Sequence, residues 1–226
     1  MNPLGKAFAY YRERGGLALA RRVRHGIWHR ERYIIYCKTL SIQEMPPAHQ
    51  QVLFRTAVAN DVPSIASNWP NHLTYVGPDV ESVLHTRLQE GDRATVGVCR
   101  ENTANLVFMA WASKRDYALL TLLGGAPKPA QACVKNVWVA EPYRRQGVAA
   151  VGLGHVERAA QDRHIDRLWA FVMPANVASR RLFERLNYRE SGTVCFAETL
   201  GRKKAMLNQN GFQKRLRLCS TGTVVP

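Results

Sequence analysis

Two arginines, a glutamine and a glycine stand in a row at residues 144–147, within the stretch PYRRQGVA. An apolar run, VKNVWVA, precedes them, and a segment of mainly small and apolar residues follows. A helix that begins near Gly147 would offer unpaired backbone N–H groups and the positive end of its dipole to an anion. The small residues Gly147 and Ala149 would let a phosphate approach the backbone, and the arginines add positive charge. The stretch therefore predicts a diphosphate site, although an ordinary turn between a strand and a helix would also explain it.

The flanking patterns predict a strand in ACVKNVWVA, a helix in GVAAVGLGHVERAAQDRH and a second strand in DRLWAFVMP. From residue 52 onward, the hydrophobic periodicity and turn residues give the order β-α-α-β-β-β-α-β-α-β-β. Within that order, RATVGVCRE and NLVFMAWASKRD predict an antiparallel hairpin, and RESGTVCFAE and FQKRLRLC are the last two strands. The expected fold class is α/β, an α+β domain built on one mixed sheet.

The chain divides by composition into a basic arm, a linker, a domain and a tail. The arm pattern places apolar residues among arginines at mostly three- and four-residue spacing over residues 4–32, which predicts amphipathic helices. RYIIYCKTL should then form a strand. The expected parts are the helical arm with its strand at 1–45, a linker at 46–51, the α/β domain at 52–200, and a basic C-terminal hairpin strand and tail at 201–226.

The stretch from Arg144 to Ala149 resembles the pyrophosphate loop of the GCN5-related N-acetyltransferase (GNAT) family, R/Q-x-x-G-x-G/A, and matches it in full. The preceding VWVAEPYRRQG is similar to the family's apolar-x-V-x-P-x-Y-R strand end. A later family pattern, N-x-x-A-x-x-L-Y-x-x-L-G-F, is similar to the residues Asn176, Ala178, Leu182, Phe183, Leu186, Asn187 and Tyr188. The resemblance covers about residues 52–200 and implies the GNAT acyl-CoA N-acyltransferase fold.

The resemblance also implies an activity, the transfer of an acetyl or other short acyl group from acyl-CoA to a primary amine by direct attack. Acetyl-CoA is the implied co-substrate, and no metal is implied. The amides of residues 146–149 would hold the pyrophosphate, and the strand through Val137 and Val139 would pair with the pantetheine arm. The implied binding residues are Val137, Val139, Arg144, Arg145, Gln146, Gly147, Val148, Ala149, Asn176 and Phe183.

Two departures from the family pattern weaken the prediction of an enzyme. Phe183 stands where the family often has a tyrosine that protonates the leaving thiolate, and Lys135 and Asn136 stand where acidic residues are common. No catalytic acid or base can be assigned, and Asn176 can serve equally as the cap of its helix. The alternative is therefore a catalytically weak, GNAT-like CoA-binding or regulatory protein, or a basic adaptor at a membrane or nucleic-acid surface.

The net charge of +15 belongs mainly to the two ends of the 226-residue chain. Residues 1–35 carry eight Lys or Arg against two Glu, and residues 201–226 carry six Lys or Arg and no acid. The arm could pack on the domain or on a second subunit in a homodimer. It could also contact a lipid surface, which its apolar residues favour over nucleic acid. The amine acceptor is of unknown class.

The five cysteines are scattered, without a C-x-x-C pair, which favours free thiols in a reducing compartment and gives no zinc pattern. An apolar fraction of 46% argues against a disordered chain. No run reaches the roughly 18–20 apolar residues that span a bilayer. We therefore expect a cytoplasmic protein, with peripheral membrane contact as an alternative for the arm.

Overall fold

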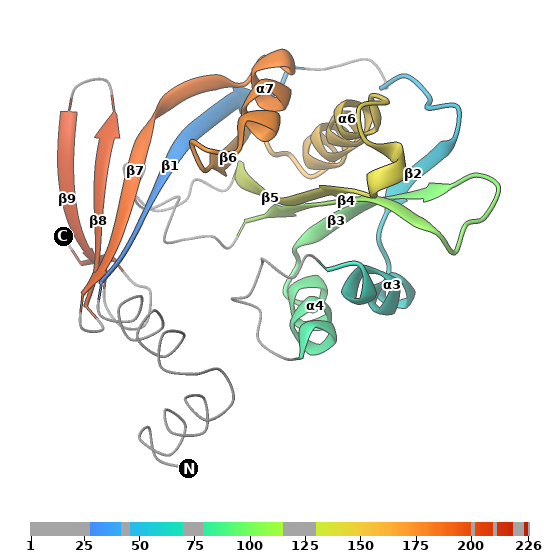
Figure 1. Cartoon of the computed structure of the whole chain (residues 1–226), viewed down its shortest axis with the longest axis horizontal. Helices are drawn as coiled ribbons and strands as arrows, with labels where there is room; N and C mark the ends of the chain where they lie inside the picture. The colour runs from blue at the N-terminus through green and yellow to red at the C-terminus, as the bar shows by residue number, and fades with distance from the viewer. Residues whose placement is uncertain are drawn as a thin grey trace, which may run out of the picture.

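The computed structural model describes residues 28–41, 46–69, 79–114, 130–199, 202–209, 212–218 and 224–225. Their strands form one sheet in the order β10-β9-β8-β7-β1-β6-β5-β4-β3-β2 (Figure 1). Only β5 and β6 pair in parallel among these neighbours. The strands are β1 Trp28–Thr39, β2 Val52–Thr56, β3 Arg93–Cys99, β4 Leu106–Ser113, β5 Gln131–Val139, β6 Arg167–Val172, β7 Arg189–Thr199, β8 Arg202–Gln209, β9 Phe212–Leu218 and β10 Val224–Val225.

Helices cover both faces of the sheet, which confirms the expected mixed α/β architecture (Figure 1). On one face, α6 and α7 pack over a core that includes Leu153, Phe108 and Phe183. On the other face, α3 and α4 enclose a second core around Trp111 and Leu84. The helices are η1 Ala59–Asp61, α3 Val62–Ser67, α4 Val80–Gln89, η3 Glu141–Tyr143, α6 Val148–Gln161 and α7 Val177–Arg185.

The N-terminal strand β1 lies inside the sheet. It pairs with β6 on one side, where Ile34 is opposite Val172, and with β7 on the other. Ile35 and Tyr36 are fully buried, and the Lys38 ammonium lies 2.7 Å from the Glu157 carboxylate of α6. The strand expected in RYIIYCKTL is thus confirmed, but it is an inner strand of the domain's sheet.

The expected order from residue 52 is confirmed through β7, including the antiparallel hairpin of β3 and β4. Three details differ. Residues 28–32, expected in the helical pattern, begin β1, and β8 and β10 were not predicted. The rest of the predicted arm helices, residues 4–27, and most of ALLTLLGGAPKPAQ lie outside the described residues.

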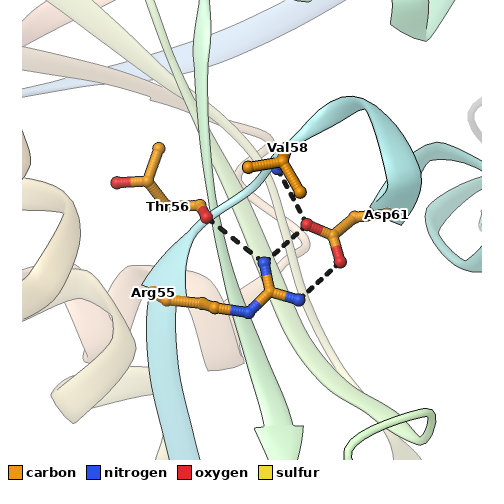
Figure 2. Close-up of polar contacts among 4 residues, drawn as sticks. All are labelled: Arg55, Thr56, Val58 and Asp61. Carbon is orange, nitrogen blue, oxygen red and sulfur yellow. Dashed lines mark hydrogen bonds and ion pairs between the residues drawn. The ribbon is translucent and has the colours of Figure 1, made fainter.

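An ion pair fixes the turn from β2 into η1 and α3. The Arg55 guanidinium donates two hydrogen bonds of 2.6 Å to the Asp61 carboxylate, which also accepts from the Val58 N–H at 2.8 Å (Figure 2). Arg55 also donates to the carbonyl oxygen of Thr56 at 3.3 Å (Figure 2). The hydrogen bonds from Arg55 lower the pKa of Asp61. This junction fixes the direction in which the chain enters α3.

Candidate functional site

The parallel strands β5 and β6 diverge part-way along their length. Their pairing runs from Gln131 opposite Arg167 to Val134 opposite Ala170 and ends there. Beyond that point β5 continues to Val139 with β4 as its partner, while the last residues of β6 pair with β1. A gap in the ladder therefore opens beside the second half of β5.

The open edge of β5 offers backbone groups to an extended ligand. Ala140 donates its N–H to Val107 of β4 at 2.8 Å, so the groups of Val137 and Val139 point to the opposite edge, because direction alternates along a strand. Arg144 Nε already donates to the carbonyl oxygen of Val139 at 3.1 Å. An unpaired strand edge is the usual template for adding an extended chain.

A β-bulge at Asn136 marks the start of the divergence. The register between β4 and β5 shifts here, and Asn136 has a φ of 52°, a left-handed conformation that Asn tolerates better than most residues. The bulge changes the alternation, so that Val134, Val137 and Val139 all pack with the core under α6. Trp138 then packs on the other face with the second core.

On the α4 face of the bulge, a cation is held between aromatic rings. Arg87 Nη1 donates to Asn136 Oδ1 at 3.3 Å, and the guanidinium lies 5.7 Å from the ring centroids of both Trp69 and Trp111. Neither Arg87 nor the bulge was expected from the sequence. The signal for the bulge was present, because the apolar residues of β5 change from even to odd positions around Asn136.

The predicted diphosphate loop lies at the end of β5, where η3 leads into α6. Arg144, Arg145, Gln146 and Gly147 are all exposed, and Val148 is buried as the first residue of α6. Arg145 and Gly147 have φ values of 63° and 83°, so the chain passes twice through the left-handed region. A Cβ at Gly147 would meet no atom within 4 Å, so the residue adjoins open space.

The hydrogen bonds of the loop leave its amides available. The N–H groups of Ala150 and Val151 donate to the Gly147 carbonyl, which begins the helix, and the first helical amides have no intrahelical acceptor. Gln146 Nε2 donates to the Pro142 carbonyl oxygen at 2.7 Å, so this side chain stabilises the loop. The first turn of α6 contains no acidic residue that would compete with an anion.

Residues 68–188, more than half of the chain, match the model of the acetyltransferase (GNAT) family. The chain belongs to the GNAT family. A comparison with curated proteins finds no significant match.

Solved structures share the GNAT fold at low sequence identity. A GCN5-related N-acetyltransferase from Sphaerobacter thermophilus has a TM-score of 0.56 and 13% identity, over 83% of this chain and 57% of that chain. A Drosophila protein has a TM-score of 0.56 and 15% identity, over 81% of this chain and 58% of its own. The chain therefore spans less than three fifths of either protein.

A third structure is that of AAC(6')-Iy in complex with the bisubstrate analogue CoA-S-monomethyl-acetylneamine. Its TM-score is 0.50 at 15% identity, over 62% of this chain and 92% of that chain. At these identities all three likenesses concern the fold.

The two predicted GNAT binding residues on α7 have structural roles. Asn176 caps the helix, because its side chain accepts the Ser179 N–H at 3.1 Å. Phe183 is only 3% exposed, stacks on Tyr36 at a centroid distance of 6.0 Å and meets the Tyr188 ring edge-on at 5.0 Å. The structure thus places Val137 and Val139 beside the gap and residues 144–149 in the loop. The Phe183 ring, by contrast, is part of the core.

The rings that contact Phe183 in this packing belong to two tyrosines of the core, Tyr36 and Tyr188. The Tyr36 hydroxyl donates to Glu184 Oε1 at 2.7 Å, and its burial and this hydrogen bond raise its pKa. The pKa of the buried Tyr188 is raised further, mainly by burial. Both tyrosines therefore keep their protons at neutral pH. Neither was expected from the sequence to approach the family's tyrosine position.

The described residues contain no group of three or more His, Cys, Asp or Glu side chains that could hold a metal ion. Within the same residues, no helix has both the length and the apolar character needed to cross a membrane.

Replacing Asn176 with Ala should lower the free energy of unfolding by about 1 kcal/mol, because the cap of α7 is lost. Asp79→Ala is the matched control, since it removes the corresponding cap of another helix. Asp79 caps α4 by accepting the Ser82 N–H at 3.0 Å. Asn176→Asp retains a capping oxygen and should retain stability. If chemical denaturation gives Asn176→Ala the same stability as the wild type, the capping role is wrong.

Proposed function

We propose that the protein is an N-acyltransferase that moves an acetyl or other short acyl group from acyl-CoA to a primary amine. The observation that carries the proposal is the open edge of β5, which leads directly from the divergence of β5 and β6 to the exposed loop at the start of α6. A ligand with an extended arm joined to a diphosphate has the shape and the charge to occupy both.

The loop would bind the pyrophosphate through the backbone amides of residues 146–149, with the positive end of the α6 dipole and Arg144 and Arg145 nearby. Val137 and Val139 would pair with the pantetheine arm through their backbone groups. The thioester would then lie near the Asn136 bulge. On the face opposite α6 and α7, Arg87 of α4 reaches this bulge.

In direct transfer the amine nitrogen attacks the thioester carbonyl carbon, the C–S bond breaks, and the CoA thiolate and the amine proton are released. The N–H groups at the open edge of β5 are suited to polarise the carbonyl oxygen. Phe183 supplies no proton, and we assign no residue as general acid or base.

The experiment that tests the proposal measures thiol release from acetyl-CoA in the presence of small amines, amino sugars and peptides with free N-termini. Amine-dependent thiol release together with an acetylated product is the expected result. If acetyl-CoA binds but no amine in the panel is acetylated, the alternative of a CoA-binding or regulatory protein is favoured. Phe183 is the observation that supports that alternative.

Phe183→Tyr should change the turnover number less than tenfold, because the ring is buried between two tyrosines and its new hydroxyl would lie in the core. It should also lower stability, since a buried hydroxyl without a partner costs about 1–3 kcal/mol. Steady-state thiol release measures the first effect and denaturation the second. A rise of a hundredfold or more, the size of a general-acid contribution, would mean that the wild type lacks a catalytic acid that this site can supply.

The amine acceptor, the cellular location and the contacts of the two termini are also proposals. The basic residues 1–35 and 201–226 support an acidic surface as a partner, with a lipid surface preferred to nucleic acid. The scattered thiols support a cytoplasmic location. The acetylneamine part of the bisubstrate analogue in the AAC(6')-Iy structure supports amino sugars as one class to include in the panel. A homodimer stays a prediction that light scattering would test.

A further inference from the structure

The segment predicted as a linker, residues 46–51, contacts the diphosphate loop. His49 Nε2 lies 3.2 Å from the carbonyl oxygen of Gln146. His49 Nδ1 accepts the backbone N–H of Gln51, also at 3.2 Å. A neutral imidazole has one donor and one acceptor nitrogen, so Nε2 carries the proton and donates to Gln146.

Further contacts hold the His49 backbone and ring in place. Arg100 Nε donates to the His49 carbonyl oxygen at 3.2 Å, and the Arg100 N–H donates to the Gln51 carbonyl oxygen at 2.9 Å. The ring meets Phe54 edge-on with centroids 6.5 Å apart, and Phe54 in turn stacks on His155 of α6 at 5.0 Å. The imidazole is therefore fixed relative to the helix that follows the loop.

A close approach at Gly154 brings the same segment against α6. A Cβ added at Gly154 would lie 2.9 Å from Pro46 Cβ, so the absence of a side chain allows Pro46 to pack there. Residues 46–51 thus lie along α6 from Gly154 to the carbonyl at Gln146. In this arrangement the segment supports the loop.

The hydrogen bond from His49 acts on one peptide group of the predicted pyrophosphate site. The Gln146 carbonyl and the Gly147 N–H belong to one planar trans peptide, so fixing the oxygen fixes the direction of the N–H, which points the opposite way. Gln146 itself lies between two residues in the left-handed conformation, Arg145 and Gly147. A donor on the carbonyl also polarises the peptide and makes its N–H a stronger donor.

We propose that His49 is a positioning residue for diphosphate binding, which orients the Gln146–Gly147 peptide so that its N–H faces the pyrophosphate of acyl-CoA. The inference rests on the proposed function, because it assigns a role within that same site. His49 does not contact the reacting atoms, and its effect should be confined to ligands that carry the diphosphate.

The test compares His49→Phe with His155→Phe in the full chain. Phenylalanine keeps an aromatic ring against Phe54 in both variants, but only His49→Phe removes the hydrogen bond to the loop. The Kd for acetyl-CoA should rise about three- to tenfold in His49→Phe, as expected for one lost hydrogen bond, and stay within twofold in His155→Phe. The Kd for S-acetylpantetheine, which lacks the diphosphate, should be unchanged in both variants.

An unchanged Kd for acetyl-CoA in a folded His49→Phe chain would overturn the inference, and so would an equal loss of affinity for both ligands. The nitrogen chemical shifts of the His49 ring in the wild type provide a test that needs no variant, since a proton on Nδ1 in place of Nε2 would also overturn it. A wild type that binds no acetyl-CoA overturns the proposed function and the inference together, whereas a His49→Phe chain with wild-type affinity overturns the inference alone.

Discussion

The variant Ile35→Asp is expected to lose cooperative unfolding. Ile35 is fully buried in β1, which pairs with β6 and β7 on its two sides. An unpaired charge at such a position costs several kcal/mol, a large part of the roughly 5–15 kcal/mol that stabilises a typical domain. Urea denaturation followed by circular dichroism measures the loss. Removing residues 1–45 should have the same result, because it removes the whole strand.

Arg32→Asp is the control for this experiment, since it introduces the same side chain in the same strand at an exposed position. It should change the free energy of unfolding by no more than about 1 kcal/mol. If Ile35→Asp is as stable as Arg32→Asp, β1 does not occupy an inner position in the sheet, and the fold described above is wrong at its centre.

The second large effect is expected on ligand binding, from Gly147→Val. Gly147 has a φ of 83°, where a β-branched residue is strained by about 1–3 kcal/mol and pushes the loop toward another conformation. The amides at residues 146–149 would then lose their common direction. The Kd for acetyl-CoA, measured by titration calorimetry, should rise by tenfold or more.

Gly91→Val provides a matched control for the backbone strain. Gly91 follows α4, has a φ of 92° and, like Gly147, would place a Cβ in open space. It should lower stability to a similar degree and leave the Kd for acetyl-CoA within twofold of the wild type. Equal losses of affinity in the two variants would show that strain, and not the loop, determines binding.

The sequence predicted those parts of the fold that depend on local signals. The hairpin of β3 and β4 and the start of α6 just after Gly147 follow from alternation and from turn residues that act within a few positions. The place of β1 depends on pairing between Ile34 and Val172, far apart in the chain, which no local pattern specifies. Its first residues also continued the helical spacing of the arm, so they were assigned to a helix.

The strand β8 was missed for a related reason. Its sequence, RKKAMLNQ, is rich in charge and poor in β-branched residues, and its pairing with β7 and β9 outweighs its weak propensity. In the candidate site, the loop at 144–149 was found because its residues are contiguous. Arg87 and His49 were not found from the sequence, because they reach the site from other elements. The contact of His49 with Gln146 spans 97 positions.

The proposed function depends on one interaction, the binding of acyl-CoA by residues 144–149 and the open edge of β5. The most direct measurement is thermal unfolding of the full wild-type chain with and without acetyl-CoA, analysed for the free energy of unfolding. A ligand present at one hundred times its Kd stabilises the folded state by about 2.7 kcal/mol, and we expect a stabilisation of this size at saturating acetyl-CoA. An unfolding curve that acetyl-CoA leaves unchanged at millimolar concentration would contradict the claim.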